Sequence, residues 1–212
     1  MIVAIDGPAG AGKSTVARML AQRLGFRYLD TGAMYRALTW LALQQSLPLG
    51  DGGPLGALAL EHPVTFDEAG RVFIGGTDVT AAIRQARVDS VVSVVAGHPE
   101  VRAVMRERQQ ELALGGNAVI EGRDIGTVVA PDAAVKVYLV ADASVRAARR
   151  QSERPEIGAD ALATDLKVRD DSDRARMQRA DDAEEIDTTE IGIDEVVARI
   201  EALVRARSLV GQ

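Results

Sequence analysis

The chain has 212 residues, of which 47% are hydrophobic, 26% charged and 3% aromatic, and its formal net charge is -6. This length suits one domain with an aliphatic core, and no apolar run approaches the ~18 residues that a membrane span needs. The acidic balance argues against broad nucleic-acid binding, and the absence of cysteine excludes disulfides, thiol nucleophiles and Cys-based metal sites.

The first half of the chain predicts α/β structure followed by a small inserted sheet. Apolar runs and their flanking glycines predict a strand at 2–5, a helix at about 13–24 ended by Gly25, a short strand at 28–29 and a helix at about 33–45. The Gly- and Pro-rich stretch 47–54 predicts a connection. Hairpin signals then predict short antiparallel strands at 64–66, 72–74 and near 79, followed by helical segments at about 80–95 and 101–114.

The second half returns to the alternating pattern. It predicts buried strands at 118–121 and 135–140, a helix from about 144, a charged helix ending near 179, a last strand at 185–188 and a terminal helix from about 193. The terminal helix carries an apolar stripe at helical spacing. Strands that alternate with helices in this way predict an open parallel α/β sheet.

Residues 7–14 match the pattern G-x-x-x-x-G-K-[ST], between a predicted strand and a predicted helix. Glycines let backbone N–H groups turn around phosphate oxygens, and the helix N-terminus adds partial positive charge. We expect Lys13 to reach the β- and γ-phosphates and Ser14 to ligate Mg²⁺. The ATP-binding residues predicted in this loop are Gly7, Pro8, Ala9, Gly10, Ala11, Gly12, Lys13, Ser14 and Thr15.

The loop by itself does not distinguish kinases from GTPases or ATPases. Residues 67–70 (DEAG) match a D-x-x-G switch pattern but lie in a predicted hairpin turn, and no N/T-K-x-D guanine-reading motif is present. A nucleotide-dependent switch is therefore the weaker interpretation. Three later segments, 30–36, 121–127 and 169–176, instead place arginines at predicted strand ends and on one helix face, where a polyanionic ligand needs them.

The motifs IDGPAGAGKST, LDTGAMYR, IEGRDIGTVV and RDDSDRAR, with the small sheet between them, strongly resemble the bacterial cytidylate kinases over essentially the whole chain. The resemblance implies a P-loop fold with a five-stranded parallel sheet in the order 2-3-1-4-5. It also implies transfer of the ATP γ-phosphoryl group to CMP or dCMP with Mg²⁺. We expect a cytoplasmic monomer without a targeting segment, membrane contact or nucleic-acid partner.

The resemblance also divides the chain. It implies a core at about 1–45, 97–150 and 180–212, an inserted acceptor-binding region at about 46–96, and a lid at about 151–168 that leads into the helix to 179. Thr31 stands where serine is common in the family, and the lid is a few residues short. The sequence therefore leaves open which lid arginine reaches which phosphate.

The site residues carry over by position. The resemblance makes Arg36, Arg123 and Arg176 ligands of the acceptor phosphate, assigns the cytosine edge to Ser93, Arg102 and Asp124, and assigns the sugar to Arg169 and Asp173. Thr31, Tyr35 and Gly122 line the acceptor site. Arg146, Arg149 and Arg150 begin the lid and close over ATP, Arg149 as an ATP ligand. The residues expected to be catalytic are Lys13, Arg123, Arg176, Arg146 and Arg150.

This assignment agrees with the chemistry, because phosphoryl transfer needs alignment and charge stabilisation more than covalent help. The acceptor phosphate is already ionised near neutral pH, so we interpret Asp124 as a base reader and not as a catalytic base. Two alternatives stay open from the residues alone. In the first, the chain is a P-loop kinase whose acceptor is UMP or a phosphorylated metabolite. In the second, residues such as Ser93 and Arg102 are ordinary solvated helix residues without a part in binding. His62 and His98 precede prolines and receive no catalytic role.

Overall fold

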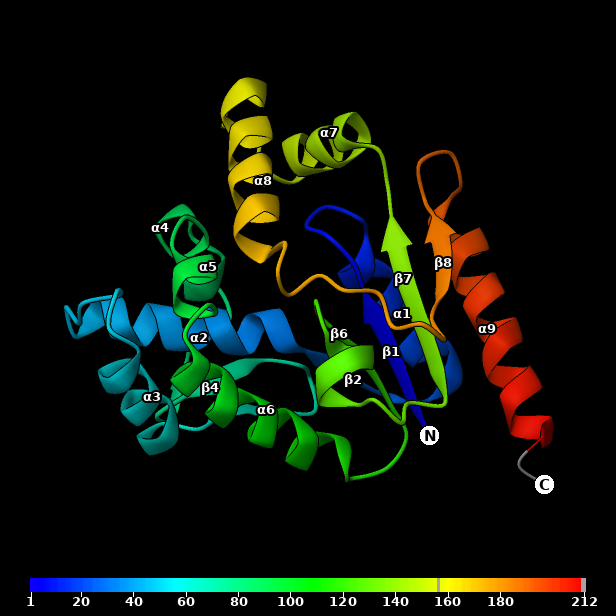
Figure 1. Cartoon of the computed structure of the whole chain (residues 1–212), viewed down its shortest axis with the longest axis horizontal. Coiled ribbons are helices and arrows are strands. Elements are labelled where there is room, and N and C mark those ends of the chain that lie inside the picture. The colour runs from blue at the N-terminus through cyan, green and yellow to red at the C-terminus, as the bar shows by residue number, and fades with distance from the viewer. Residues whose placement is uncertain (156, 211–212) are drawn as a thin grey trace. The chain divides into compact units, whose positions relative to one another are not determined.

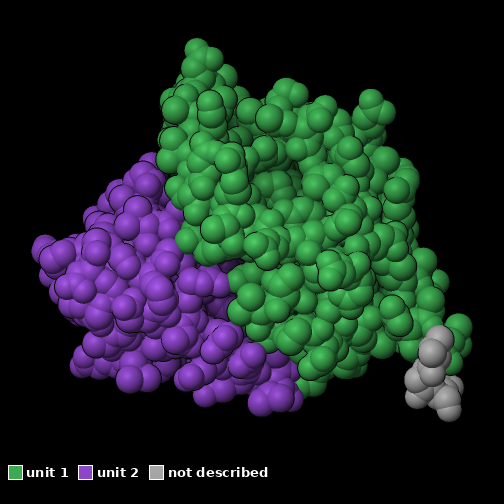
Figure 2. All heavy atoms as spheres, viewed as in Figure 1, with its two compact units in different colours: residues 1–29, 115–212 green, residues 30–114 purple. Residues whose placement is uncertain are grey.

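The computed structural model describes residues 1–155 and 157–210. Residue 156 of the expected lid and residues 211–212 of the expected core lie outside this description. The described residues of 1–29 and 115–212 form one compact unit, and residues 30–114 form a second (Figure 2). The expected inserted region, 46–96, lies within the second unit.

A parallel sheet forms the centre of the first unit (Figure 1). Its strands are β1 (Ile2–Asp6), β2 (Arg27–Asp30), β6 (Ala118–Glu121), β7 (Val135–Val140) and β8 (Glu184–Asp187). Among the described residues they run in the order β2-β6-β1-β7-β8, which confirms the expected order 2-3-1-4-5. In this order β1 is the central strand, between β6 and β7, so the loop after β1 begins at the carboxyl end of the middle of the sheet.

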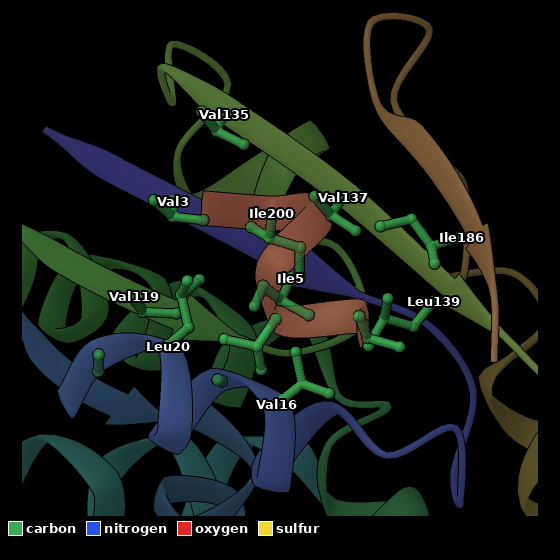
Figure 3. Close-up of a cluster of buried hydrophobic side chains, with 14 of the residues drawn as sticks. Val3, Ile5, Val16, Leu20, Val119, Val135, Val137, Leu139, Ile186 and Ile200 are labelled. Carbon is green, nitrogen blue, oxygen red and sulfur yellow. The ribbon is translucent and has the colours of Figure 1, made fainter. Parts of the chain in front are cut away.

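Two helices, α1 (Lys13–Leu24) and α9 (Ile193–Val210), cover one face of this sheet. Alternate strand residues such as Val3 and Ile5 point into that layer, where Leu20 and Ile200 meet them (Figure 3). Burial of each such aliphatic side chain stabilises the fold by about 1.5–3 kcal/mol. Aliphatic side chains therefore form this core although the chain has few aromatic residues. Their close packing holds β1, the strand that leads into the phosphate loop.

The helix α1 has the bounds that the sequence predicted. It begins after Gly12, whose φ of 89° is left-handed, and it ends at Gly25, whose φ is 66°. The N–H of Gly25 caps the helix by donating to the carbonyls of Ala21 and Gln22. Both ends therefore need residues without a Cβ, which explains why the glycine pattern located the helix so accurately.

The second unit is built around α2 (Thr31–Gln44), which contacts most of the other elements of that unit. These elements are α3 (Gly52–Glu61), β3 (Val64–Phe66), β4 (Val72–Ile74), β5 (Thr77–Asp78), η1 (Ala82–Arg84), α4 (Ala86–Asp89), α5 (Val92–Val95) and α6 (Pro99–Ala113). The strands form an antiparallel sheet in the order β3-β4-β5, which confirms the predicted small sheet. Pro99 occupies the first turn of α6, as its fixed φ favours.

The prediction of a connection through 47–54 is wrong from residue 52 onwards, where α3 begins. Two of its three glycines, Gly52 and Gly56, are four residues apart and share the face that approaches α6: a Cβ on Gly52 or Gly56 would lie 2.2 or 3.0 Å from atoms of Glu100. Asp51 caps the helix by accepting a hydrogen bond from the N–H of Gly53. These glycines therefore serve close helix packing and do not mark a turn.

Other boundaries also differ from the prediction. The helical stretch 80–95 is broken into η1, α4 and α5. The two helices predicted from about 144 and up to 179 are present as α7 (Ala143–Glu153) and α8 (Ala159–Asp173). The helix α8 ends at Asp173, and not near 179, and one further turn follows it, in which the N–H groups of Arg176 and Met177 donate to the Asp173 carbonyl. One wide helical turn, η2 (Ile125–Val129), follows β6. Within the described part of the chain, no helix is both long and apolar enough to span a membrane.

Candidate active site

The glycine-rich loop follows β1 and starts with a close approach to the neighbouring strand. A Cβ on Gly7 would lie only 2.2 Å from the carbonyl oxygen of Leu139 in β7, and the φ of Gly7 is 143°. Only glycine fits this position, since both the space and the backbone conformation exclude a side chain. The loop that starts here leads to the N-terminus of α1, a position that favours an anion.

Lys13, the first residue of α1, is 6% exposed, and its Nζ donates to the carbonyl of Pro8 at 2.7 Å. Burial lowers the pKa of Lys13 well below its usual value, the nearby positive charge of Arg123 lowers it further, and Glu121 and Asp6 oppose the shift. A bound polyanion would restore the balance by favouring the charged amine. The amine therefore lies within the loop that it is expected to serve.

Glu121 is a site residue for which the sequence analysis gave no role. It ends β6, is 4% exposed, and accepts hydrogen bonds from Ser14 Oγ at 3.0 Å and from Tyr28 Oη at 2.5 Å. A hydroxyl and a carboxylate side by side are the oxygen donors that Mg²⁺ prefers, so this pair fits the expected ion. The sequence showed only an acidic residue at the end of a predicted buried strand, and its position beside Ser14 comes from the fold.

Three of the predicted acceptor residues of the first unit lie together. Asp173 Oδ2 accepts from Arg123 Nε at 3.0 Å, and its Oδ1 accepts from Arg176 at 2.6 Å. Burial raises the pKa of Asp173, but the charge of Arg123 and the hydrogen bonds from both arginines outweigh it, so the net pKa is lowered. Arg123 and Arg169 also act electrostatically on Lys13. The arginine charges therefore act directly on the lysine of the phosphate loop.

The three arginines of α7 have separate environments. Arg146 is buried, donates to the carbonyls of Ala9 and Ala141, and pairs with Asp170 of α8 at 2.7 Å. Arg149 donates to the hydroxyl and the carbonyl oxygens of Thr188, at 3.0 and 2.6 Å. Arg150 pairs with Glu153, one turn along the same helix. Arg146 therefore joins the back of the phosphate loop to α8, while Arg149 is tied to the segment after β8.

The second unit carries the remaining predicted residues. Thr31, Tyr35 and Arg36 lie on α2, Ser93 lies on α5, and Arg102 lies on α6. Arg36 donates through Nε to Asp89 at 3.0 Å, and Asp30, which caps α2, pairs with Arg84 at 2.9 Å. The sequence analysis assigned nothing to Arg84 or Asp89, since neither lies in a recognisable motif.

The family model for cytidylate kinases matches residues 3–206. The chain belongs to the cytidylate kinase family. Cytidylate kinases of Shouchella clausii, Geobacillus sp. and Enterococcus faecalis are 51%, 48% and 45% identical to it, each over 97% of this chain and 96% of the relative. Membership in the family makes the chain an enzyme, a nucleoside monophosphate kinase.

Solved structures extend the comparison to the fold. A shikimate kinase from Bacteroides thetaiotaomicron matches 97% of this chain and 98% of its own, with a TM-score of 0.51 and 14% identity. A gluconokinase from Sinorhizobium meliloti matches 98% of this chain and 94% of its own, with a TM-score of 0.51 and 13% identity. The cytidylate kinase chain thus shares the P-loop kinase fold with these proteins, as expected.

The buried carboxyl group of Asp6 should make the unfolding free energy of the chain depend on pH. Burial raises the pKa of Asp6 from 3.8 to about 6, against the effect of two backbone N–H donors. An acid whose pKa is higher in the folded state stabilises the fold at low pH and loses that contribution as the pH rises through the folded pKa. From about pH 4 to about pH 7, the unfolding free energy of the wild type should fall by about 2 kcal/mol relative to Asp6→Asn. Urea unfolding at both pH values tests this, and a constant difference would contradict the raised pKa.

Proposed function

We propose that this enzyme transfers the γ-phosphoryl group of ATP to CMP and dCMP in the presence of Mg²⁺, yielding ADP and CDP or dCDP. The observation that carries the proposal is the grouping of Lys13 with Arg123, Asp173 and Arg176 in the first unit, where the charges of Lys13 and Arg123 act on each other. A loop for one phosphate chain and an arginine pair for another fit a reaction between two phosphorylated substrates.

On the donor side, the backbone N–H groups of residue 7 and residues 9–15 and the amine of Lys13 bind the β- and γ-phosphates, and Pro8 contributes no N–H group. Ser14 and Glu121 would hold Mg²⁺, which supplies charge neutralisation on those phosphates. We assign Arg146, Arg149 and Arg150 to the lid side of ATP. Because Arg146 already bridges the phosphate loop and α8, its contribution is to link lid position to the loop.

On the acceptor side, Arg36, Arg123 and Arg176 orient the phosphate of CMP, and Arg169 and Asp173 bind its sugar. Ser93, Arg102 and Asp124 read the cytosine edge, and Thr31, Tyr35 and Gly122 line the site. An acceptor phosphate oxygen forms the new bond to the γ-phosphorus, and the bond from that phosphorus to the bridging oxygen of ADP breaks. Positioning and positive charge stabilise this transfer without a general base.

A coupled ADP-release assay with CMP, dCMP, UMP, AMP, GMP and no acceptor tests the reaction. CMP and dCMP are expected to give the fastest turnover. Equal rates with and without any acceptor would refute the kinase proposal, and faster turnover with UMP or AMP would refute the cytosine specificity. Asp124→Ala should raise the KM for CMP by about 10²-fold and leave the KM for ATP nearly unchanged. Asp132→Ala, an exposed aspartate between β6 and β7, is the matched control.

A further inference from the structure

Asp6 is a buried carboxylate with no role in the reaction as proposed above. It is the last residue of β1, it directly precedes Gly7, and it is 5% exposed. Its Oδ1 accepts the N–H of Ile125 and its Oδ2 accepts the N–H of Gly126, each at 2.8 Å. Both oxygens of one carboxylate thus hold two successive N–H groups of another segment.

The segment that Asp6 holds carries the predicted acceptor residues. The N–H of Gly122 donates to the carbonyl of Ile5 at 3.0 Å, so the chain is attached to β1 on the near side of Arg123. Asp6 attaches it again on the far side of Asp124. Arg123 and Asp124 therefore form a two-residue bridge, and both of its ends are tied to the strand residues that lead into the phosphate loop.

The space around this attachment is closed. A Cβ on Gly126 would lie 3.2 Å from Lys136 Cδ and 3.5 Å from Asp6 Oδ2, so the glycine lies between the two side chains. Among the described residues, Lys13 of α1, Asp124 of the bridge and Tyr138 of β7 interact electrostatically with Asp6. The amine of Lys136 is itself paired with Asp182. A rigid, desolvated hydrogen-bonded pair of this kind restricts the backbone that it holds.

We propose that Asp6 is a positioning residue, whose carboxylate clamps the Arg123–Asp124 bridge to the root of the phosphate loop and so sets the spacing between donor and acceptor. The effect on the spacing between donor and acceptor rests on the proposed function, whereas the clamp itself is a property of the fold. Because a carboxylate only accepts hydrogen bonds, both N–H groups are satisfied at once. An asparagine of the same shape satisfies one of them and turns its NH₂ group toward the other.

Asp6→Asn tests the clamp, with Asp78→Asn as the control, since Asp78 accepts the N–H of Thr80 at an exposed site in the other unit. Amide hydrogen exchange at Ile125 and Gly126 should accelerate about tenfold or more in Asp6→Asn. The Kd for CMP, measured by calorimetry, should rise about tenfold, while the Kd for ATP stays within about twofold. The control variant should change none of these values.

Three outcomes separate the ideas. Unchanged exchange at Ile125 and Gly126 overturns the clamp, and faster exchange with an unchanged Kd for CMP overturns the positioning role. A wild type that fails to bind CMP overturns the proposed function and, with it, the proposed effect on donor–acceptor spacing. The exchange result still decides whether the clamp exists.

If Asp6→Asn does not fold, hydrogen exchange in the wild type at two pH values tests the clamp instead. Protection of Ile125 and Gly126, corrected for intrinsic rates and compared with Ile5, should fall from about pH 7.5 to about pH 5, and a constant ratio would contradict the clamp.

Discussion

Lys13→Met is expected to lower kcat by about 10²–10³-fold, the loss typical when one donor to a developing negative charge is removed. Methionine keeps the length and apolar stem of lysine, so the packing at the start of α1 is retained. The lost element is the amine, which lies in the loop against the Pro8 carbonyl and shares the field of Arg123. The Kd for ATP should rise as well, because the phosphate chain loses its buried cation.

Lys167→Met is the matched control, since Lys167 is an exposed lysine of α8 and one of only three lysines in the chain. Steady-state kinetics with saturating CMP, together with calorimetric titration of ATP, give the two quantities. A kcat for Lys13→Met within about threefold of the wild type would remove Lys13 from the mechanism. Equal losses in both variants would point to instability, which thermal unfolding of each variant detects.

Arg176→Lys is expected to lower kcat/KM for CMP by about 10²-fold while leaving the KM for ATP within about twofold. The substitution keeps the charge but removes the planar fork, and one ammonium cannot reproduce the paired hydrogen bonds of a guanidinium. In the described structure Arg176 shares Asp173 with Arg123, so the variant also weakens the hold on that carboxylate.

The control for this change is two residues away. Arg174 has an 80% exposed side chain and pairs with Asp171 at the surface. The variant Arg174→Lys therefore makes the same chemical change near the end of α8 without altering a contact of the proposed site. Unchanged kinetics are expected for it. If Arg176→Lys also retains wild-type kcat/KM for CMP, Arg176 does not orient the acceptor phosphate.

The sequence located features that depend on local patterns. The bounds of α1 follow from glycine geometry at residues 12 and 25, and the strands β1, β6 and β7 follow from apolar runs. The sheet order came from the family resemblance, because composition carries no information on which strands are neighbours. The grouping of Arg123, Asp173 and Arg176 was expected from the same source and is present in the structure.

Features that depend on long-range packing escaped the sequence. The sequence pattern placed Gly52 in a connection, although Gly52 and Gly56 form the contact face of α3 with α6. The hydrogen bond from Ser14 to Glu121 joins residues 107 positions apart, and the hydrogen bonds of Asp6 to Ile125 and Gly126 span 119 and 120 positions. Such pairs arise only when the sheet brings β1 and β6 together, so no local pattern announces them.

The carboxylate of Asp173 has a consequence for competition between ligands. It is buried, and both of its oxygens are engaged by the arginines that are proposed to bind the acceptor phosphate. A small anion that captures those arginines leaves a desolvated carboxylate without its partners, which is costly. A nucleotide offers sugar hydroxyls in exchange, whereas an anion without a hydroxyl group, such as chloride, offers no donor. The site therefore disfavours occupancy by such anions without any steric barrier against them.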